Sequence, residues 1–136
     1  MSLKELEDLP ENTLLSIDTI LSKLKVDSQE LIPAIAQQYD TGEVLMMAYM
    51  NEASIRETLK TEQVCYWSRS RQTYWRKGES SGHLQKLVSM SFDCDGDCIL
   101  LQVDQIGAAC HTNRRNCFFF EVKEDQVIIN SSPQES

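Results

Sequence analysis

The sequence contains no apolar run that approaches the roughly 20 residues of a membrane-spanning helix. Its start, MSLKELEDLPENT, is acidic and lacks the apolar segment of a secretory signal peptide. Internal repeats and low-complexity segments are also missing. These absences argue against a membrane or secreted protein, and we expect a soluble cytoplasmic protein that has no membrane partner.

Basic residues are few. The chain has 13 Lys and Arg against 21 Asp and Glu, a net charge of -8, which argues against a nucleic-acid partner. One stretch reverses the balance, because residues 65–88 carry five basic side chains and a single acidic one. A basic middle in an acidic chain suits a small anionic ligand bound at one place. A solvated basic face would give the same count.

Cysteine is present in an odd number, five, in a chain without a secretion signal. Disulfides are therefore not expected, and metal-binding or catalytic roles gain weight. Cys65 lies in the apolar run V-C-Y-W and is interpreted as a buried core thiol. The other four cysteines fall between residues 94 and 117.

The 136 residues suffice for one domain with a real core, and the hydrophobic pattern indicates an α+β fold, mostly antiparallel sheet with two or three helices. An amphipathic helix is predicted at 12–25 with Asn12 as its N-cap, and a second at 52–60 after Asn51. Apolar runs on both sides of the turn at 40–43 predict a hairpin. Further strands are predicted at 63–68, 84–92, 98–106, 117–122 and 126–129.

The segment 68–83 is rich in turn formers and polar donors, and we interpret it as a long functional loop or hairpin. Trp67, Tyr74 and Trp75 are assigned to the sheet core in preference to a base-stacking surface. No strand–helix alternation supports a doubly wound fold. The expected organisation is a helical extension at 1–30, a main domain at 31–130 and a disordered tail at 131–136.

Three carboxylates alternate in D-C-D-G-D, at Asp93, Asp95 and Asp97. On a strand they would share one face, and in a tight turn they could converge on one ion. Oxygen ligands of this kind suit Mg²⁺. An EF-hand loop is rejected, because its sixth and twelfth positions would be Cys98 and Asp104 in place of Gly and Glu.

The same stretch resembles the strand and D-x-D-G motif of haloacid-dehalogenase-type phosphatases. There Asp93 would be the nucleophile and Asp95 an acid/base. Those phosphatases have a Thr after the glycine, where this chain has Asp97. They also need a large domain after the motif, and only 39 residues remain here. This resemblance stays a weak competitor.

The clustered thiols are Cys94, Cys98, Cys110 and Cys117. Four thiolates would close a structural zinc site, whereas three thiolates and a water would leave a catalytic site open. His111 follows Cys110 directly and could move protons beside the metal or replace a ligand. The thiols alone do not distinguish a structural zinc site from a catalytic one.

Two groups of donors suit phosphate or carboxylate guests. The first belongs to the polar segment and the second lies close to the thiols. Their members are Arg69, Lys77, Ser80, Ser81 and Gly82, and Arg114 and Arg115. His83 follows them in a polar loop and is assigned to the surface.

Taken together, these motifs resemble one family, phosphoribosyl-AMP cyclohydrolase of histidine biosynthesis. The stretches that carry the resemblance occur in the family's order and cover roughly residues 31–122. They are T-G-E-V-L-M-M-A-Y-M-N (41–51), Y-W-S-R-S-R (66–71), W-R-K-G-E-S-S-G (75–82), D-C-D-G-D (93–97) and A-C-H-T-N-R-R-N-C-F (109–118). No pyrophosphohydrolase domain follows, so the stand-alone form is expected.

The resemblance implies an intertwined homodimer with Zn²⁺ and Mg²⁺ as cofactors. Zinc would be bound by Cys94 of one subunit with Cys110 and Cys117 of the other, and magnesium by Asp93, Asp95 and Asp97. Cys98 stands where the family has a small residue and is not counted as a ligand. Asn113 and Asn116 stand where glycine and serine are common, and Asn113 tolerates the left-handed backbone that a glycine provides.

The implied reaction is zinc-dependent hydrolysis of the C6–N1 bond in the adenine ring of a phosphorylated nucleotide, 1-(5-phosphoribosyl)-AMP. Zinc would supply hydroxide by lowering the pKa of a bound water to about 7, and His111 is the candidate general base. The donors named above, Arg69 and Lys77 among them, would hold the two phosphates. Two alternatives remain, a Mg²⁺-dependent phosphatase that uses Asp93 and a non-catalytic nucleotide-binding module held by structural zinc.

Overall fold

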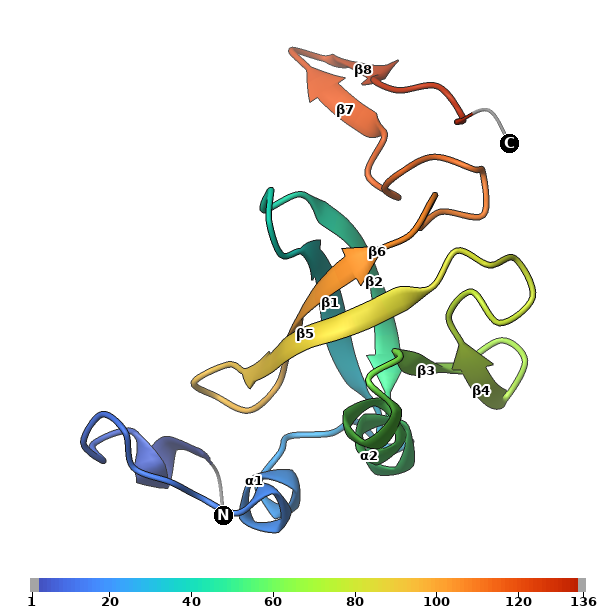
Figure 1. Ribbon diagram of the computed structural model, residues 1–136. Coiled ribbons are helices and arrows are strands. Elements are labelled where there is room, and N and C mark those ends of the chain that lie inside the picture. Colours follow the sequence, from blue (N-terminus) through green and yellow to red (C-terminus); the bar gives the residue numbers. More distant parts are fainter. Residues whose placement is uncertain (1–2, 135–136) are drawn as a thin grey trace.

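The computed structural model describes residues 3–134 (Figure 1). The strands of its main sheet are β1 (Ile32–Gln38), β2 (Val44–Met50), β3 (Cys65–Ser68), β4 (Thr73–Arg76), β5 (Gln85–Phe92) and β6 (Ile99–Gln105). The remaining elements are η1 (Leu3–Leu6), α1 (Ile17–Ser22), α2 (Glu52–Thr61), β7 (Phe120–Lys123) and β8 (Gln126–Ile129).

Within the described residues, the main sheet has the order β4-β3-β2-β1-β6-β5. Only the neighbours β1 and β6 run parallel there, and the other neighbouring strands are antiparallel. The helices lie toward one end of the sheet and the hairpin β7–β8 toward the other (Figure 1). The predicted α+β class is confirmed, and in the described part of the chain no helix is long and apolar enough to cross a membrane.

The predicted hairpin around 40–43 is confirmed as β1 and β2. Alternate residues of β1 are buried, which places Ile32, Ala34 and Ala36 in the core. This alternation is the period-two pattern of a strand with one covered face. Two apolar side chains of β6, Ile99 and Leu101, complete the centre of that core.

Helix α2 forms where it was predicted because both of its ends are capped. The Asn51 side chain accepts a hydrogen bond from the Ser54 amide at 2.9 Å, and the Ser54 hydroxyl accepts one from the Asn51 amide at 2.9 Å. This reciprocal pair is a capping box. Glu62 ends the helix in a left-handed conformation, and Ile55 anchors its inner face in the core.

The helix predicted at 12–25 is much shorter, and its predicted N-cap is wrong. Asn12 has a left-handed backbone, with φ 71°, that no helix start adopts. The Thr13 amide and hydroxyl both bond to the Pro10 carbonyl, which closes a turn instead. The helix begins at Ile17 after Ser16, whose side chain accepts a hydrogen bond from the Thr19 amide.

The polar segment 68–83 contains a strand, β4, that pairs with β3. Of its aromatic residues, Trp75 packs on the core beside Tyr66, with ring centroids 5.5 Å apart. Tyr74 is 38% exposed and meets Trp67 edge-on, so the predicted core position holds only in part. Cys65 is fully buried, as predicted.

Residues 117–134 form a separate C-terminal arm. Its strand β7 starts at Phe120, later than predicted, because the Cys117 amide bonds to the Leu45 carbonyl of β2. After β8 the chain returns to the loop that carries Cys110 and Cys117 (the thiol loop), where the Ser131 carbonyl accepts a hydrogen bond from Arg114 at 2.9 Å. Disorder of the tail stays a prediction, and its last two residues, 135–136, lie outside the described residues.

Candidate active site

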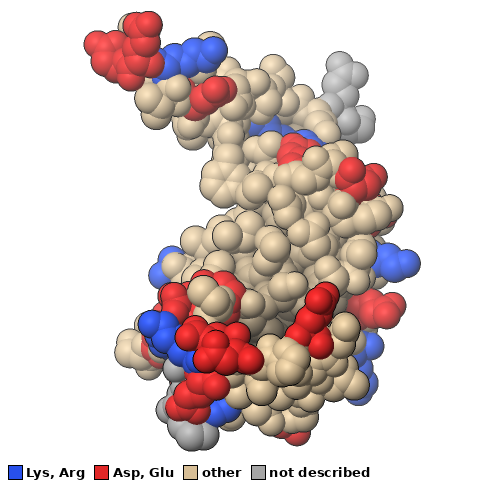
Figure 2. Space-filling model, turned by 90° about the vertical axis from the view of Figure 1, so that its left-hand side faces the viewer, with Lys and Arg blue, Asp and Glu red and all other residues tan. Residues whose placement is uncertain are grey.

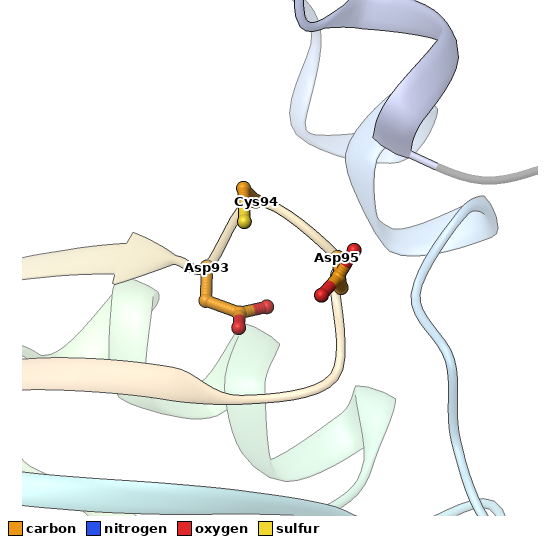
Figure 3. Close-up of side chains that lie close together, drawn as sticks. All are labelled: Asp93, Cys94 and Asp95. Atoms are coloured by element: carbon orange, nitrogen blue, oxygen red, sulfur yellow. The ribbon is translucent and has the colours of Figure 1, made fainter.

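The candidate ligands occupy the two ends of strand β6. Cys94 lies in the turn before the strand (Figure 3), and Cys110 and Cys117 lie in the loop after it. A strand of seven residues is about 20 Å long at roughly 3.3 Å per residue. Within a single chain, Cys94 is therefore separated from Cys110 and Cys117.

The loop after β6 is a hairpin that brings Cys110 and Cys117 together. Its backbone closes through two hydrogen bonds of 3.1 Å, from the Ala109 amide to the Arg115 carbonyl and from the Cys110 amide to the Arg114 carbonyl. Asn113 takes the left-handed backbone at the tip, with φ 65°, as the sequence predicted. The Cys117 amide bonds to β2 at 2.8 Å and fixes the second thiol on the sheet.

The two thiols are electrostatically unequal. Burial raises the pKa of the Cys110 thiol, but hydrogen bonds from the Thr112 hydroxyl, 3.0 Å away, and the Thr112 amide outweigh it, and the net pKa is lowered. Burial, together with the neighbouring Cys110, raises the pKa of Cys117 to about 11. Cys110 is thus the first of the pair to ionise.

These thiols line a pocket of about 480 Å³. Both histidines of the chain, His83 and His111, line it, with Lys77 and Trp75 on its wall. His111 is exposed at the rim of the pocket. A pocket that combines two thiols with two imidazoles can hold a soft or borderline metal ion and carry out proton transfer beside it.

His83 was assigned to the surface from the sequence, and the structure places it in this pocket. Its ring lies against Gly107, where a Cβ would come within 2.6 Å of the imidazole. Its amide donates to the Ser81 hydroxyl at 3.1 Å. The only sequence signal for this position is that His83 is one of two histidines and follows the donor-rich segment.

The acidic turn joins β5 to β6 at the other end. Asp93, Cys94 and Asp95 each offer a ligand atom, and these atoms lie within 4.8 Å of one another (Figure 3). The Asp97 amide donates to Asp93 at 3.0 Å. This hydrogen bond lowers the pKa of Asp93, whereas the Asp93 side chain raises that of Asp97.

The turn has hard oxygen donors with a thiol between them, which fits a divalent cation beside a thiolate. It links two antiparallel strands directly. The phosphatase alternative requires a βαβ unit after the motif, so the structure gives it no support. The Lys4 ammonium, 3.7 Å from Asp95, lies at the edge of the cluster.

The family model for phosphoribosyl-AMP cyclohydrolase matches residues 46–119. The phosphoribosyl-AMP cyclohydrolase of Hydrogenovibrio crunogenus is 53% identical over 133 residues, which cover 98% of this chain and 90% of that protein. The enzyme of the same name from Magnetococcus marinus is 62% identical over 114 residues, covering 84% of this chain and 88% of that protein. The chain belongs to the phosphoribosyl-AMP cyclohydrolase family.

The cyclohydrolase match confirms the resemblance seen in the sequence and makes the chain a member of an enzyme family. Its residues, 46–119, include both ends of β6, the polar segment and the thiol loop. The match to the Hydrogenovibrio crunogenus cyclohydrolase extends over almost the whole chain, so the N-terminal extension and C-terminal arm are shared with that relative.

The phosphate-binding residues predicted for a cyclohydrolase do not all gather at one place. Ser81 and Lys77 line the thiol pocket, and Ser80 lines a neighbouring pocket of about 300 Å³. Gly82 lies in the same exposed loop. Arg69 lies elsewhere, with its guanidinium 4.0 Å from the centroid of the Tyr49 ring.

The two arginines of the cyclohydrolase thiol loop are already engaged within the chain. Arg114 stacks on Phe119 at 4.0 Å from the ring centroid. Arg115 donates to the carbonyls of Gln105 and Gly107, both at 2.8 Å. These contacts hold the loop against the end of β6, and phosphate binding by either arginine stays a prediction.

Proposed function

We propose that the chain is a zinc-dependent phosphoribosyl-AMP cyclohydrolase that opens the C6–N1 bond of 1-(5-phosphoribosyl)-AMP. The product would be the phosphoribosylformimino-aminoimidazole carboxamide ribotide of L-histidine biosynthesis. The observation that carries the proposal is the pocket in which Cys110, Cys117 and His111 meet, in a chain of this family.

Zinc fits the donor set of this pocket. Cys110 and Cys117 converge there, and the lowered pKa of Cys110 favours a thiolate ligand. A third thiolate would leave one coordination position open, and zinc so bound supplies an activated water. We assign the third ligand to Cys94, whose thiol is exposed in the acidic turn.

This assignment requires a second copy of the chain. Strand β6 separates Cys94 from the other two thiols by about 20 Å within one chain. Cys94 of the partner subunit must therefore complete the site, which makes a homodimer part of the proposal. Twofold symmetry would then give two equivalent zinc sites.

The C-terminal arm supports a dimer. Its hairpin β7–β8 projects from the body of the molecule (Figure 2), and a two-stranded hairpin is marginally stable by itself. Large apolar side chains on it are open to solvent, with Phe120 66% and Val122 71% exposed. Exposed apolar surface of this kind marks an interaction site.

In this mechanism His111 takes a proton from the attacking water and returns it to the leaving nitrogen. His111 is exposed, follows Cys110 directly and lines the same pocket, which supports this role. Trp75 supplies an apolar part of the pocket wall.

We also assign Mg²⁺ to the acidic turn, with Asp93, Asp95 and Asp97 as its ligands. The phosphates would meet Arg69, the loop donors Ser80, Ser81 and Gly82, and the arginines of the thiol loop, Arg114 and Arg115.

The test is to follow the ultraviolet change when zinc-loaded protein is incubated with phosphoribosyl-AMP and Mg²⁺. Turnover that a zinc chelator abolishes and added zinc restores would support the reaction and the metal together. A folded, zinc-replete dimer that leaves the substrate unchanged would refute the proposal.

A further inference from the structure

Lys77 is a buried cation in an unusual position. Its residue is 8% exposed, and over residues 3–134 its ammonium has no acidic side chain within 4.0 Å. Its Nζ donates to the Ala109 carbonyl at 2.6 Å. A buried charge without a counter-charge is costly, so the structure around it should supply a negative group.

The two thiols of the pocket could supply this negative charge as thiolates. Cys110 follows Ala109 directly, and Cys110, Cys117 and Lys77 line the same pocket. Burial lowers the pKa of the Lys77 ammonium, and the charges of Cys117 and Cys110 oppose this shift. One hydrogen bond to Ala109 leaves two of the three N–H donors for the pocket.

The Lys77 side chain is also poorly placed to bind a phosphate. Its Nζ is 5.3 Å from the centroid of the Trp75 ring, under the thiol loop, whereas the serines of its segment are exposed. The hydrogen bond of the ammonium is donated to the Ala109 carbonyl, next to Cys110. The Lys77 ammonium is therefore directed toward the proposed metal ligands.

The charge of the proposed zinc site matches this cation. Zn²⁺ with three thiolates has a net charge of -1, which a buried site must neutralise. We propose that Lys77 is a positioning residue of the zinc site, which holds the backbone beside Cys110 and balances the third thiolate. The inference rests on the three-thiolate zinc site proposed above and replaces the phosphate-binding role predicted for this lysine.

The test measures zinc affinity by competition with a chromophoric chelator, without substrate. Lys77→Gln can still donate to Ala109 but carries no charge, and Lys77→Arg keeps the charge. Lys86→Gln, at an exposed lysine of β5, is the matched control. Loss of a supporting contact to a metal site typically weakens affinity about 10- to 100-fold, which is expected for Lys77→Gln.

Lys77→Arg should recover most of this loss, and the control should match the parent protein. A cobalt-loaded sample gives a second reading, because the thiolate-to-metal absorption of Lys77→Gln should shift from that of the parent. Unchanged zinc affinity and cobalt spectrum for Lys77→Gln, with only its KM raised, would overturn the inference in favour of phosphate binding. If the parent protein itself bound no zinc, the proposed function would fail first.

Discussion

At the scale of single residues, the same side chain has different properties in different parts of this molecule. Cys65 is enclosed by the sheet and α2, Cys94 is open on a turn, and Cys110 is activated by Thr112. Composition alone cannot separate these roles. Burial and hydrogen bonding do, because burial raises the pKa of a thiol whereas hydrogen bonds donated to its sulfur lower it.

Cys65 gives a pH prediction. Burial raises the pKa of its thiol to about 12, and the neighbouring Glu57 adds to the shift. In the unfolded chain the thiol ionises near pH 9, so this group supports the folded state fully below that pH. Its contribution falls by up to about 1.4 kcal/mol per pH unit as pH rises toward the folded pKa.

Cys65→Ala should therefore show a shallower loss of stability between pH 9 and 11 than the parent protein, as measured by urea unfolding at each pH. The comparison concerns the slope, because the smaller side chain lowers stability at every pH. Parallel slopes would contradict the assigned cause.

His111 gives a prediction about catalysis. His111→Ala should keep zinc, because the three proposed ligands are untouched, and should lose turnover by about 10²- to 10⁴-fold as a general base is removed. Zinc content and kcat are measured on the same preparation. Turnover close to that of the parent protein would remove the base assignment.

At the scale of elements, the tight loop from Gly78 to His83 forms part of the pocket wall, and its two glycines allow its packing to be tested. Both glycines of this loop have left-handed backbones, with φ +83° at Gly78 and +81° at Gly82. A Cβ at Gly78 would come within 2.4 Å of the His83 backbone, whereas a Cβ at Gly82 would meet nothing within 4 Å. The two sites share the conformational strain and differ in the clash.

Gly82→Ala should cost about 1 to 2 kcal/mol of unfolding free energy, the strain of a left-handed alanine. Gly78→Ala should cost at least about 2 kcal/mol more, because backbone must move to accept the Cβ. Urea unfolding of both variants measures the difference. Equal losses would show that the loop is not packed as described.

The elements also show what a sequence can predict. Helix α2 was predicted because Asn51 marks its start locally. The length of the helix predicted at 12–25 was overestimated because its leucines have helical spacing. Leu14 is 94% exposed, so its side chain buries little apolar surface that could stabilise a longer helix. Strand β4 was predicted only as part of a loop or hairpin, since its formation depends on pairing with β3 and not on local preference.

At the scale of the whole molecule, the motifs identified most residues of the site, and the family resemblance implied their division between two subunits. Cys94 and Cys110 are close in sequence but lie at opposite ends of β6, which agrees with that division. His83 was missed, because a loop closure against Gly107 brings it to the thiol pocket. Long-range packing of this kind leaves no local pattern.

If two chains share each zinc site, as proposed, a mixed dimer should show it. Cys94→Ser and Cys110→Ser should each be inactive as homodimers. When the two are co-expressed with different tags, random pairing makes half of the dimers mixed, and each mixed dimer has one intact site of two.

The mixture should therefore regain about a quarter of the parent activity, and purified mixed dimers should bind about one zinc each. Mixed dimers that remain inactive and free of zinc, although each variant folds and dimerises, would contradict a zinc site built from Cys94 of the partner subunit.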